Sequence, residues 1–132
     1  MTNALFILLM FSSCVKHFEE KEVCGYYTPV NYKNNFDTIQ FLPNSKYLRR
    51  VYDINKKLVL EMKGNWKLTE QKSKIQIDGF YLNLDDDLVK FPELSKDTNM
   101  MVISVLETNM EIIQFCAGHY PNQNCYQKVK SE

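Results

Sequence analysis

Apolar and polar side chains alternate along most of the chain with the two-residue period that is typical of half-buried β-strands. In residues 37–42, for example, Ile39 and Phe41 fall on one face, and Thr38 and Gln40 fall on the other. Runs rich in turn-forming Asn, Asp, Ser, Pro and Gly separate these segments. The pattern predicts short strands at residues 22–28, 37–42, 47–52, 58–62, 74–77, 79–84, 100–106, 110–116 and 125–129.

The order of these segments predicts an all-β fold, an antiparallel meander of about 8–9 strands that closes as a barrel or folds as a sandwich. Turns are expected at 43–45 and 53–56, and Gly64 is expected to form a β-bulge before Trp66. Residues 89–99 have the weakest pattern and are expected to form a loop or a single helical turn. The predicted core residues are Ile39, Phe41, Leu48, Val51, Leu60, Trp66, Ile75, Ile77, Phe80, Leu82, Val102, Val105, Ile113 and Phe115.

The start of the chain differs because residues 4–11 form an unbroken apolar run. Eight residues span about 12 Å as a helix, far less than the hydrocarbon core of a bilayer, so a membrane-spanning helix is not expected. The run has the length of the apolar part of a signal peptide, and Ser12 and Ser13 place small residues just before Cys14. The alternatives are an ordinary secreted protein and a buried N-terminal strand.

Residues 11–14, Phe-Ser-Ser-Cys, resemble a bacterial lipobox. The resemblance implies cleavage before Cys14, acylation of Cys14 and anchoring in the bacterial cell envelope, as an outer-membrane lipoprotein on the periplasmic or surface face. The chain is then expected to divide into a signal peptide at 1–13, a lipidated tether at 14–21 and a single β-barrel-like domain at 22–132.

The tether is expected to be a solvated spacer in which His17 serves as a spacer residue and not as a ligand. Alternatively, the charged Lys16, Glu19 and Glu20 close after Cys14 resemble the stretch that directs some Gram-negative lipoproteins to the cell surface.

Three phrases of the mature chain follow one another in a recognisable order. Residues 25–27 read Gly-Tyr-Tyr, residues 41–47 look like F-x-x-[ND]-G-x-Y with Ser45 in the place of the Gly, and residues 64–68 look like G-x-W-x-L. Together they resemble the small lipocalin-like lipoproteins of Gram-negative envelopes over residues 22–84. The resemblance implies a lipocalin-like barrel or half-barrel and leaves the ligand unnamed.

Three cysteines remain besides Cys14, and an exported location permits disulfides between them. They allow three pairings, each of which leaves one thiol. A bridge from Cys24 to a late cysteine is feasible if the first and last strands are neighbours. We favour Cys116–Cys125, because turn-forming residues separate two segments that read as paired strands. This bridge would contribute about 2.5–3 kcal/mol on the chain-entropy model.

No catalytic constellation, metal site or cofactor motif can be read from the sequence. His119 near Cys116 and Cys125 lacks a third residue to orient it as a base and a fourth ligand for a metal. Residues 85–87 are consecutive Asp, whereas calcium loops alternate their ligands. The chain has 16 basic and 16 acidic residues, and this zero net charge argues against nucleic-acid binding.

The leading hypothesis is therefore a non-enzymatic binding module that holds a small apolar or amphipathic ligand in the mouth of the barrel. Arg49 and Arg50 point to opposite faces of one strand, so one of them could enter the barrel and meet a ligand carboxylate, with Arg50 as the candidate.

The alternative is a protein inhibitor or immunity-type lipoprotein that blocks an enzyme or toxin in the envelope through the loop 117–124. His119 and Tyr120 are the candidate contact residues of this loop. A cavity inside the barrel would favour the first hypothesis, and a filled core with a projecting loop would favour the second.

Overall fold

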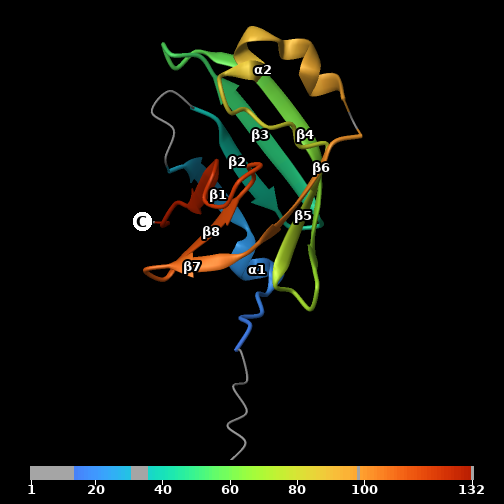
Figure 1. Ribbon diagram of the computed structural model, residues 1–132, viewed down its shortest axis with the longest axis vertical. Helices are drawn as coiled ribbons and strands as arrows, with labels where there is room; N and C mark the ends of the chain where they lie inside the picture. Colours follow the sequence, from blue (N-terminus) through green and yellow to red (C-terminus); the bar gives the residue numbers. More distant parts are fainter. Residues whose placement is uncertain (1–13, 31–35, 98, 132) are drawn as a thin grey trace, which may run out of the picture.

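The computed structural model describes residues 14–30, 36–97 and 99–131, so the predicted signal peptide lies outside the described residues. Within those ranges, nine antiparallel strands form one nearly closed, barrel-shaped sheet (Figure 1), which confirms the all-β prediction. The elements in chain order are α1 (Glu20–Val23), β1 (Gly25–Pro29), β2 (Thr38–Leu42), β3 (Lys46–Tyr52), β4 (Leu58–Thr69), β5 (Lys74–Asp78), α2 (Asp87–Lys90), the 3-10 helix η1 (Pro92–Lys96), β6 (Met101–Val105), β7 (Glu107–Asn109), β8 (Ile112–Cys116) and β9 (Cys125–Lys128).

The strand order in the sheet is β6-β5-β4-β3-β2-β1-β9-β8-β7. The first six strands form a meander, with α2 and η1 in the long connection between β5 and β6, and β9 then pairs antiparallel with β1. The first and last strands of the domain are therefore neighbours, as expected of a closed barrel. β6 and β7 follow each other with only Leu106 between them, but β6 pairs with β5 whereas β7 pairs with β8. One nearly continuous stretch of chain thus changes partner at Leu106 and brings the two ends of the sheet together.

Gly64 does not form the predicted β-bulge, because β4 runs through it in regular register opposite Tyr47. A Cβ atom at Gly64 would lie 2.5 Å from the Tyr47 ring, so the glycine makes room for that ring. The irregularity in this pair of strands lies instead between Val51 and Tyr52. The predicted turns at 43–45 and 53–56 are present.

Aromatic rings fill the interior of the barrel. Tyr27 and Phe41 meet edge to face with centroids 5.1 Å apart, and Phe115 stacks on Tyr126 at 5.3 Å. Trp66 packs against Phe41, and its indole N–H donates to the Leu42 carbonyl oxygen at 3.0 Å. All five rings are almost completely buried. The prediction of a core on the inward strand faces is confirmed for most positions.

Two predicted core positions are wrong. On β3 the buried positions are Tyr47, Arg49 and Val51, which leaves Leu48 on the outer face and only partly buried. On β6 the inward side chains are Val102 and Ser104, so Val105 points outward and is 56% exposed. Strict alternation cannot bury both Val102 and Val105, because they stand three positions apart and an odd spacing puts two side chains on opposite faces.

The predicted strand at 79–84 is also wrong, although Phe80 and Asn83 are buried there. This segment does not pair with a neighbouring strand, and its polar groups form hydrogen bonds elsewhere. The Tyr81 carbonyl oxygen accepts from Arg49, and the Asn83 side-chain oxygen accepts from the Leu88 N–H at the start of α2. The 3-10 helix η1 lies within the region of weakest strand pattern, 89–99, and α2 begins two residues before that region. Leu88 joins a small second core with Val51.

Phe18 is an exception to the solvated spacer expected at residues 14–21, whereas His17 and Glu19 are exposed. Phe18 is fully buried in the main core, and its N–H donates to the Lys72 carbonyl oxygen at 2.9 Å. Lys72 forms an ion pair with Glu19 at 3.0 Å, and the His17 ring contacts the Gln71 carbonyl oxygen. The short α1 follows at once. The segment is held because the β4–β5 turn provides backbone acceptors beside an opening that the Phe18 ring fills.

Candidate binding sites

The arginine inside the barrel is Arg49, which is completely buried. Its Nε and Nη2 donate to Oδ2 of Asp37 at 2.8 and 2.5 Å, and its Nη1 donates to the Tyr81 carbonyl oxygen at 2.5 Å. The guanidinium also lies 4.1 Å from the centroid of the Phe80 ring. Burial lowers the pKa of Arg49, but the charge of Asp37, its hydrogen bond to Arg49 and the nearby Tyr126 and Tyr47 together more than offset this effect, so the pKa is raised and the group stays charged.

Tyr126 completes this network by donating its hydroxyl proton to Oδ2 of Asp37 at 2.9 Å. Burial raises the pKa of Tyr126 strongly, and the neighbouring Asp37 carboxylate raises it further, so Tyr126 remains neutral. The interior positive charge is therefore matched by a carboxylate of the protein itself. The Arg49–Asp37–Tyr126 network joins β3, the start of β2 and β9, and it does not offer a free cation to a ligand.

Arg50, the candidate chosen from the sequence, faces outward from the same strand. Its Nε donates to Oε2 of Glu61 at 3.1 Å on the neighbouring β4, and both side chains are partly exposed. The idea that one of the two arginines enters the barrel is confirmed, but it applies to Arg49, and the carboxylate that it meets belongs to Asp37. Arg50, the candidate chosen from the sequence, is therefore not the inward residue.

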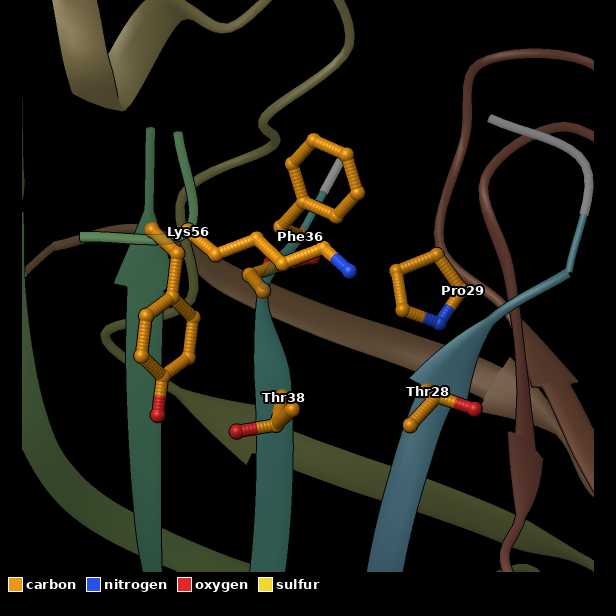
Figure 2. A pocket seen from close by; sticks show the side chains of 7 residues that line it. Thr28, Pro29, Phe36, Thr38 and Lys56 are labelled. Atoms are coloured by element: carbon orange, nitrogen blue, oxygen red, sulfur yellow. The ribbon is translucent and has the colours of Figure 1, made fainter. Parts of the chain in front are cut away.

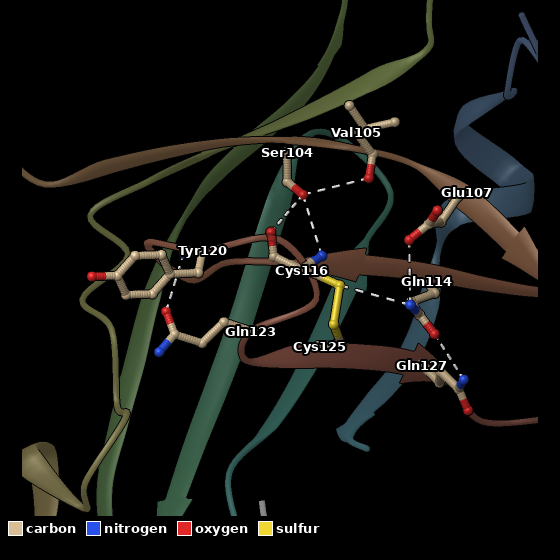
Figure 3. The surroundings of a disulfide bond; sticks show 9 residues. All are labelled: Ser104, Val105, Glu107, Gln114, Cys116, Tyr120, Gln123, Cys125 and Gln127. Carbon is tan, nitrogen blue, oxygen red and sulfur yellow. Dashed lines mark hydrogen bonds between the residues drawn. A yellow bond between two sulfur atoms is a disulfide. The ribbon is translucent and has the colours of Figure 1, made fainter. Parts of the chain in front are cut away.

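The loop 117–124 is closed at its base by the predicted disulfide Cys116–Cys125, with Cα atoms 3.9 Å apart. Within it, the N–H groups of His119 and Tyr120 both donate to the side-chain oxygen of Gln123. The Tyr120 ring projects from the loop and is 72% exposed (Figure 3). His119 is exposed as well.

The disulfide removes the thiols that a Cys–His nucleophile at His119 would need. Cys24 is a free, partly buried cysteine, and burial raises the pKa of its thiol, as does the nearby Glu20. In the described part of the chain, no three His, Cys, Asp or Glu side chains are grouped so that they could hold a metal ion. Cys14 is exposed. No helix in residues 14–30, 36–97 and 99–131 is both long and apolar enough to cross a membrane.

A groove with a volume of about 470 Å³ lies at the end of the barrel where β1, β2 and β3 meet. Its rings come from Pro29, Phe36 and Tyr52, its hydroxyl groups include those of Thr28 and Thr38, and its charged residues are Asp37 and Lys56. Figure 2 shows the Lys56 side chain reaching across the end of β2 toward Pro29, with Phe36 beside it. Nζ of Lys56 lies 6.0 Å from the centroid of the Phe36 ring.

In comparisons with known proteins, no family model matches the chain, and no curated protein or solved structure matches it. The class that the fold defines is a small, nearly closed antiparallel barrel with an aromatic interior.

The sequence analysis missed the Arg49–Asp37–Tyr126 network and the groove. A signal for the first was present, because Tyr47, Arg49 and Val51 alternate on one face of a strand. The partner Asp37 had no such signal, since it stands 12 residues away at the beginning of another strand. The groove depends on how three strand ends and a turn come together, which no local pattern encodes.

Proposed function

We propose that this protein is a non-enzymatic, lipid-anchored binding protein of the bacterial cell envelope that engages another protein through the loop 117–124. The observation that carries the proposal is the exposed Tyr120 ring on a loop that a disulfide closes. Tyrosine is enriched among the residues that dominate protein–protein binding energy, because it combines a large apolar ring with a polar tip. A loop that is already ordered loses less conformational entropy on binding.

The filled interior supports a partner at the surface over a ligand inside the barrel. Trp66, Phe41 and Tyr126 occupy the space that a lipocalin-like ligand would need, and Arg49 is neutralised by Asp37. A ligand inside the barrel would have to displace these packed rings. Removing a buried aromatic ring from a core typically costs about 3–5 kcal/mol. An inhibitor or immunity-type role, in which the loop blocks an enzyme or toxin, fits this arrangement.

The anchor part of the proposal rests on the lipobox resemblance and on the exposure of Cys14. Acyl chains contribute about 0.8 kcal/mol per buried CH₂ to membrane binding. Cys14→Ala should therefore move the protein from the membrane fraction to the soluble fraction. Unchanged fractionation, together with an unmodified N-terminus in the mass spectrum of the wild-type protein, would refute the anchor.

The partner part is tested by cross-linking in native envelope extract, followed by mass spectrometry for proteins and lipids. Tyr120→Ala should remove a specific cross-linked protein that the wild type captures. Tyr26→Ala is the matched control, because Tyr26 is also exposed, at 48%, but lies on β1 away from the loop. The proposal fails if both variants retain the same cross-linked proteins, or if the enriched material is lipid alone.

A further inference from the structure

The groove beside Lys56 lies on the outside of the sheet and not in its interior. On β1, β2 and β3, the side chains of Tyr27, Ile39 and Val51 are buried. The groove-lining Thr28, Thr38 and Tyr52 each stand next to one of these residues, so they point to the opposite face. The groove thus opens on the outer face, and it shares Asp37, whose Oδ2 bonds to Arg49 and Tyr126, with the interior network. None of its described lining residues belongs to the loop that carries Tyr120.

Three rings give this groove a mostly apolar lining. Pro29, Phe36 and Tyr52 contribute ring surfaces from three different segments, and Thr28 and Thr38 contribute hydroxyl groups. A volume of about 470 Å³ falls within the range of sites that hold small organic molecules. Ring faces in such a lining favour a planar aromatic body, because aromatic pairs gain from offset-stacked and edge-to-face contacts.

The lining and the Arg49 side chain behind it together carry one net positive charge. The Asp37 carboxylate already accepts two hydrogen bonds from Arg49, and these two charges cancel. Lys56 forms no ion pair with any residue in the described part of the chain, and its ammonium group lies beside the Phe36 ring. A ligand with one negative charge would therefore meet an available cation at the rim of an apolar groove.

We propose that this groove binds a small aromatic carboxylate, with its ring between Phe36, Tyr52 and Pro29 and its carboxylate on Nζ of Lys56. This site is independent of the protein partner proposed above, since it uses none of the residues of the loop 117–124.

The experiment compares three probes that share one ring system and differ in charge: 2-naphthoate, 2-naphthamide and 2-naphthylmethylammonium. Binding to the full mature chain is measured by calorimetric titration. The expected order is naphthoate tighter than naphthamide by about fivefold, as for a partly exposed ion pair, with the cation weakest. Decanoate is the fourth probe, which carries the same charge on a flexible chain, and it is expected to bind more weakly than naphthoate.

Three variants assign the binding to the groove. Lys56→Gln should make naphthoate and naphthamide bind equally, whereas Lys57→Gln, the matched change one residue along, should preserve their difference. Thr38→Trp places a large side chain in the groove and should abolish binding of both probes, with an unchanged unfolding transition as proof of folding. Equal affinity for all three naphthyl probes in the wild type, or naphthoate binding that survives Thr38→Trp, would overturn the proposal. Preference for decanoate would overturn the aromatic assignment.

Discussion

The barrel is completed along two seams that are built in different ways. At the terminal seam, β1 pairs with β9 through backbone hydrogen bonds, which extend beyond the strands from the Val30 N–H to the Cys125 carbonyl oxygen and from the Val129 N–H to the Tyr26 carbonyl oxygen. At the serine seam, β6 and β8 are not paired in the sheet, and the Ser104 side chain hydrogen-bonds across them. Oγ of Ser104 accepts from the Cys116 N–H at 3.2 Å and donates to the Cys116 carbonyl oxygen at 2.7 Å (Figure 3).

The terminal seam is also supported from the inside. The Arg49–Asp37–Tyr126 network connects β3, β2 and β9 behind it, whereas the serine seam depends on a hydroxyl group and on the turn of the chain at Leu106. The two seams of one barrel-shaped sheet can therefore be held by different kinds of interaction. Backbone pairing and a buried ion pair stabilise one side, and we expect the other side to open locally at a smaller cost in free energy.

The largest effect is expected when the network behind the terminal seam is broken. Asp37→Ala leaves the buried Arg49 charge without a partner and should lower the free energy of unfolding by about 3–5 kcal/mol. Denaturant titration measures the loss. Glu61→Ala removes the partner of Arg50 on the outer face and serves as the control, with an expected loss of at most about 1 kcal/mol. Equal losses in the two variants would contradict a supporting role for the network.

A smaller loss is expected when the bridge that joins β8 to β9 is removed. The double variant Cys116→Ser, Cys125→Ser opens a loop of about ten residues, and the chain-entropy model predicts a loss of about 2.7 kcal/mol. Chemical denaturation under non-reducing conditions measures it. Non-reducing peptide mapping of the wild type provides the control, because a linked peptide that contains Cys24 would refute the pairing on which this number rests.

Ser104→Ala tests the serine seam directly. It leaves the Cys116 N–H and carbonyl oxygen without the Ser104 hydroxyl, and the expected loss is about 1–3 kcal/mol. Hydrogen exchange should become faster at the Cys116 amide and remain unchanged at the Val129 amide of the terminal seam. Ser95→Ala is the control, because the Ser95 hydroxyl bonds only to the Pro92 carbonyl oxygen on the surface. Equal acceleration of exchange at both seams would show that the barrel opens as one unit.

The weakest effect appears only at alkaline pH. Burial raises the pKa of Tyr126 above its ordinary value of 10.0, so above that pH the unfolded chain releases a proton that the native state retains. The unfolded state then binds fewer protons, and the free energy of unfolding should fall as the pH rises. Tyr126→Phe should make this fall shallower, whereas Tyr120→Phe, on the exposed loop, should leave it unchanged. Thermal unfolding at a series of pH values measures the slope.

The strand pattern was readable because one face of most strands is consistently apolar, as at Ile39 and Phe41 on β2. The assignment of the buried face fails on β3, because apolar side chains stand on both of its faces. Which face is buried depends on which of the two arginines meets a buried carboxylate. The strand prediction fails at 79–84 because that segment alternates like a strand but bonds to side chains. The Arg49 side chain that bonds to the Tyr81 carbonyl oxygen lies 32 residues away in the sequence, so no local pattern could identify it as the partner.

Among the candidate sites, the disulfide loop was predictable from the sequence, whereas the burial of Phe18 was not. The disulfide and its loop follow from local spacing, and the structure agrees with that pairing. Phe18 was read as part of a spacer because a single apolar residue among charged neighbours carries no periodicity. Its burial depends on an opening at the end of the barrel, which exists only after the strands have assembled.

If Cys14 is acylated as proposed, the docking of Phe18 limits the distance between the domain and the membrane. Four residue steps separate Cys14 from Phe18, and an extended chain covers at most about 14 Å over that length. A domain anchored through Cys14 would therefore lie close to the bilayer surface, with the α1 end of the barrel toward the lipid. The β3–β4 turn that carries Lys56 lies at the opposite end (Figure 1), so the groove would face away from the membrane and receive its ligand from the aqueous side.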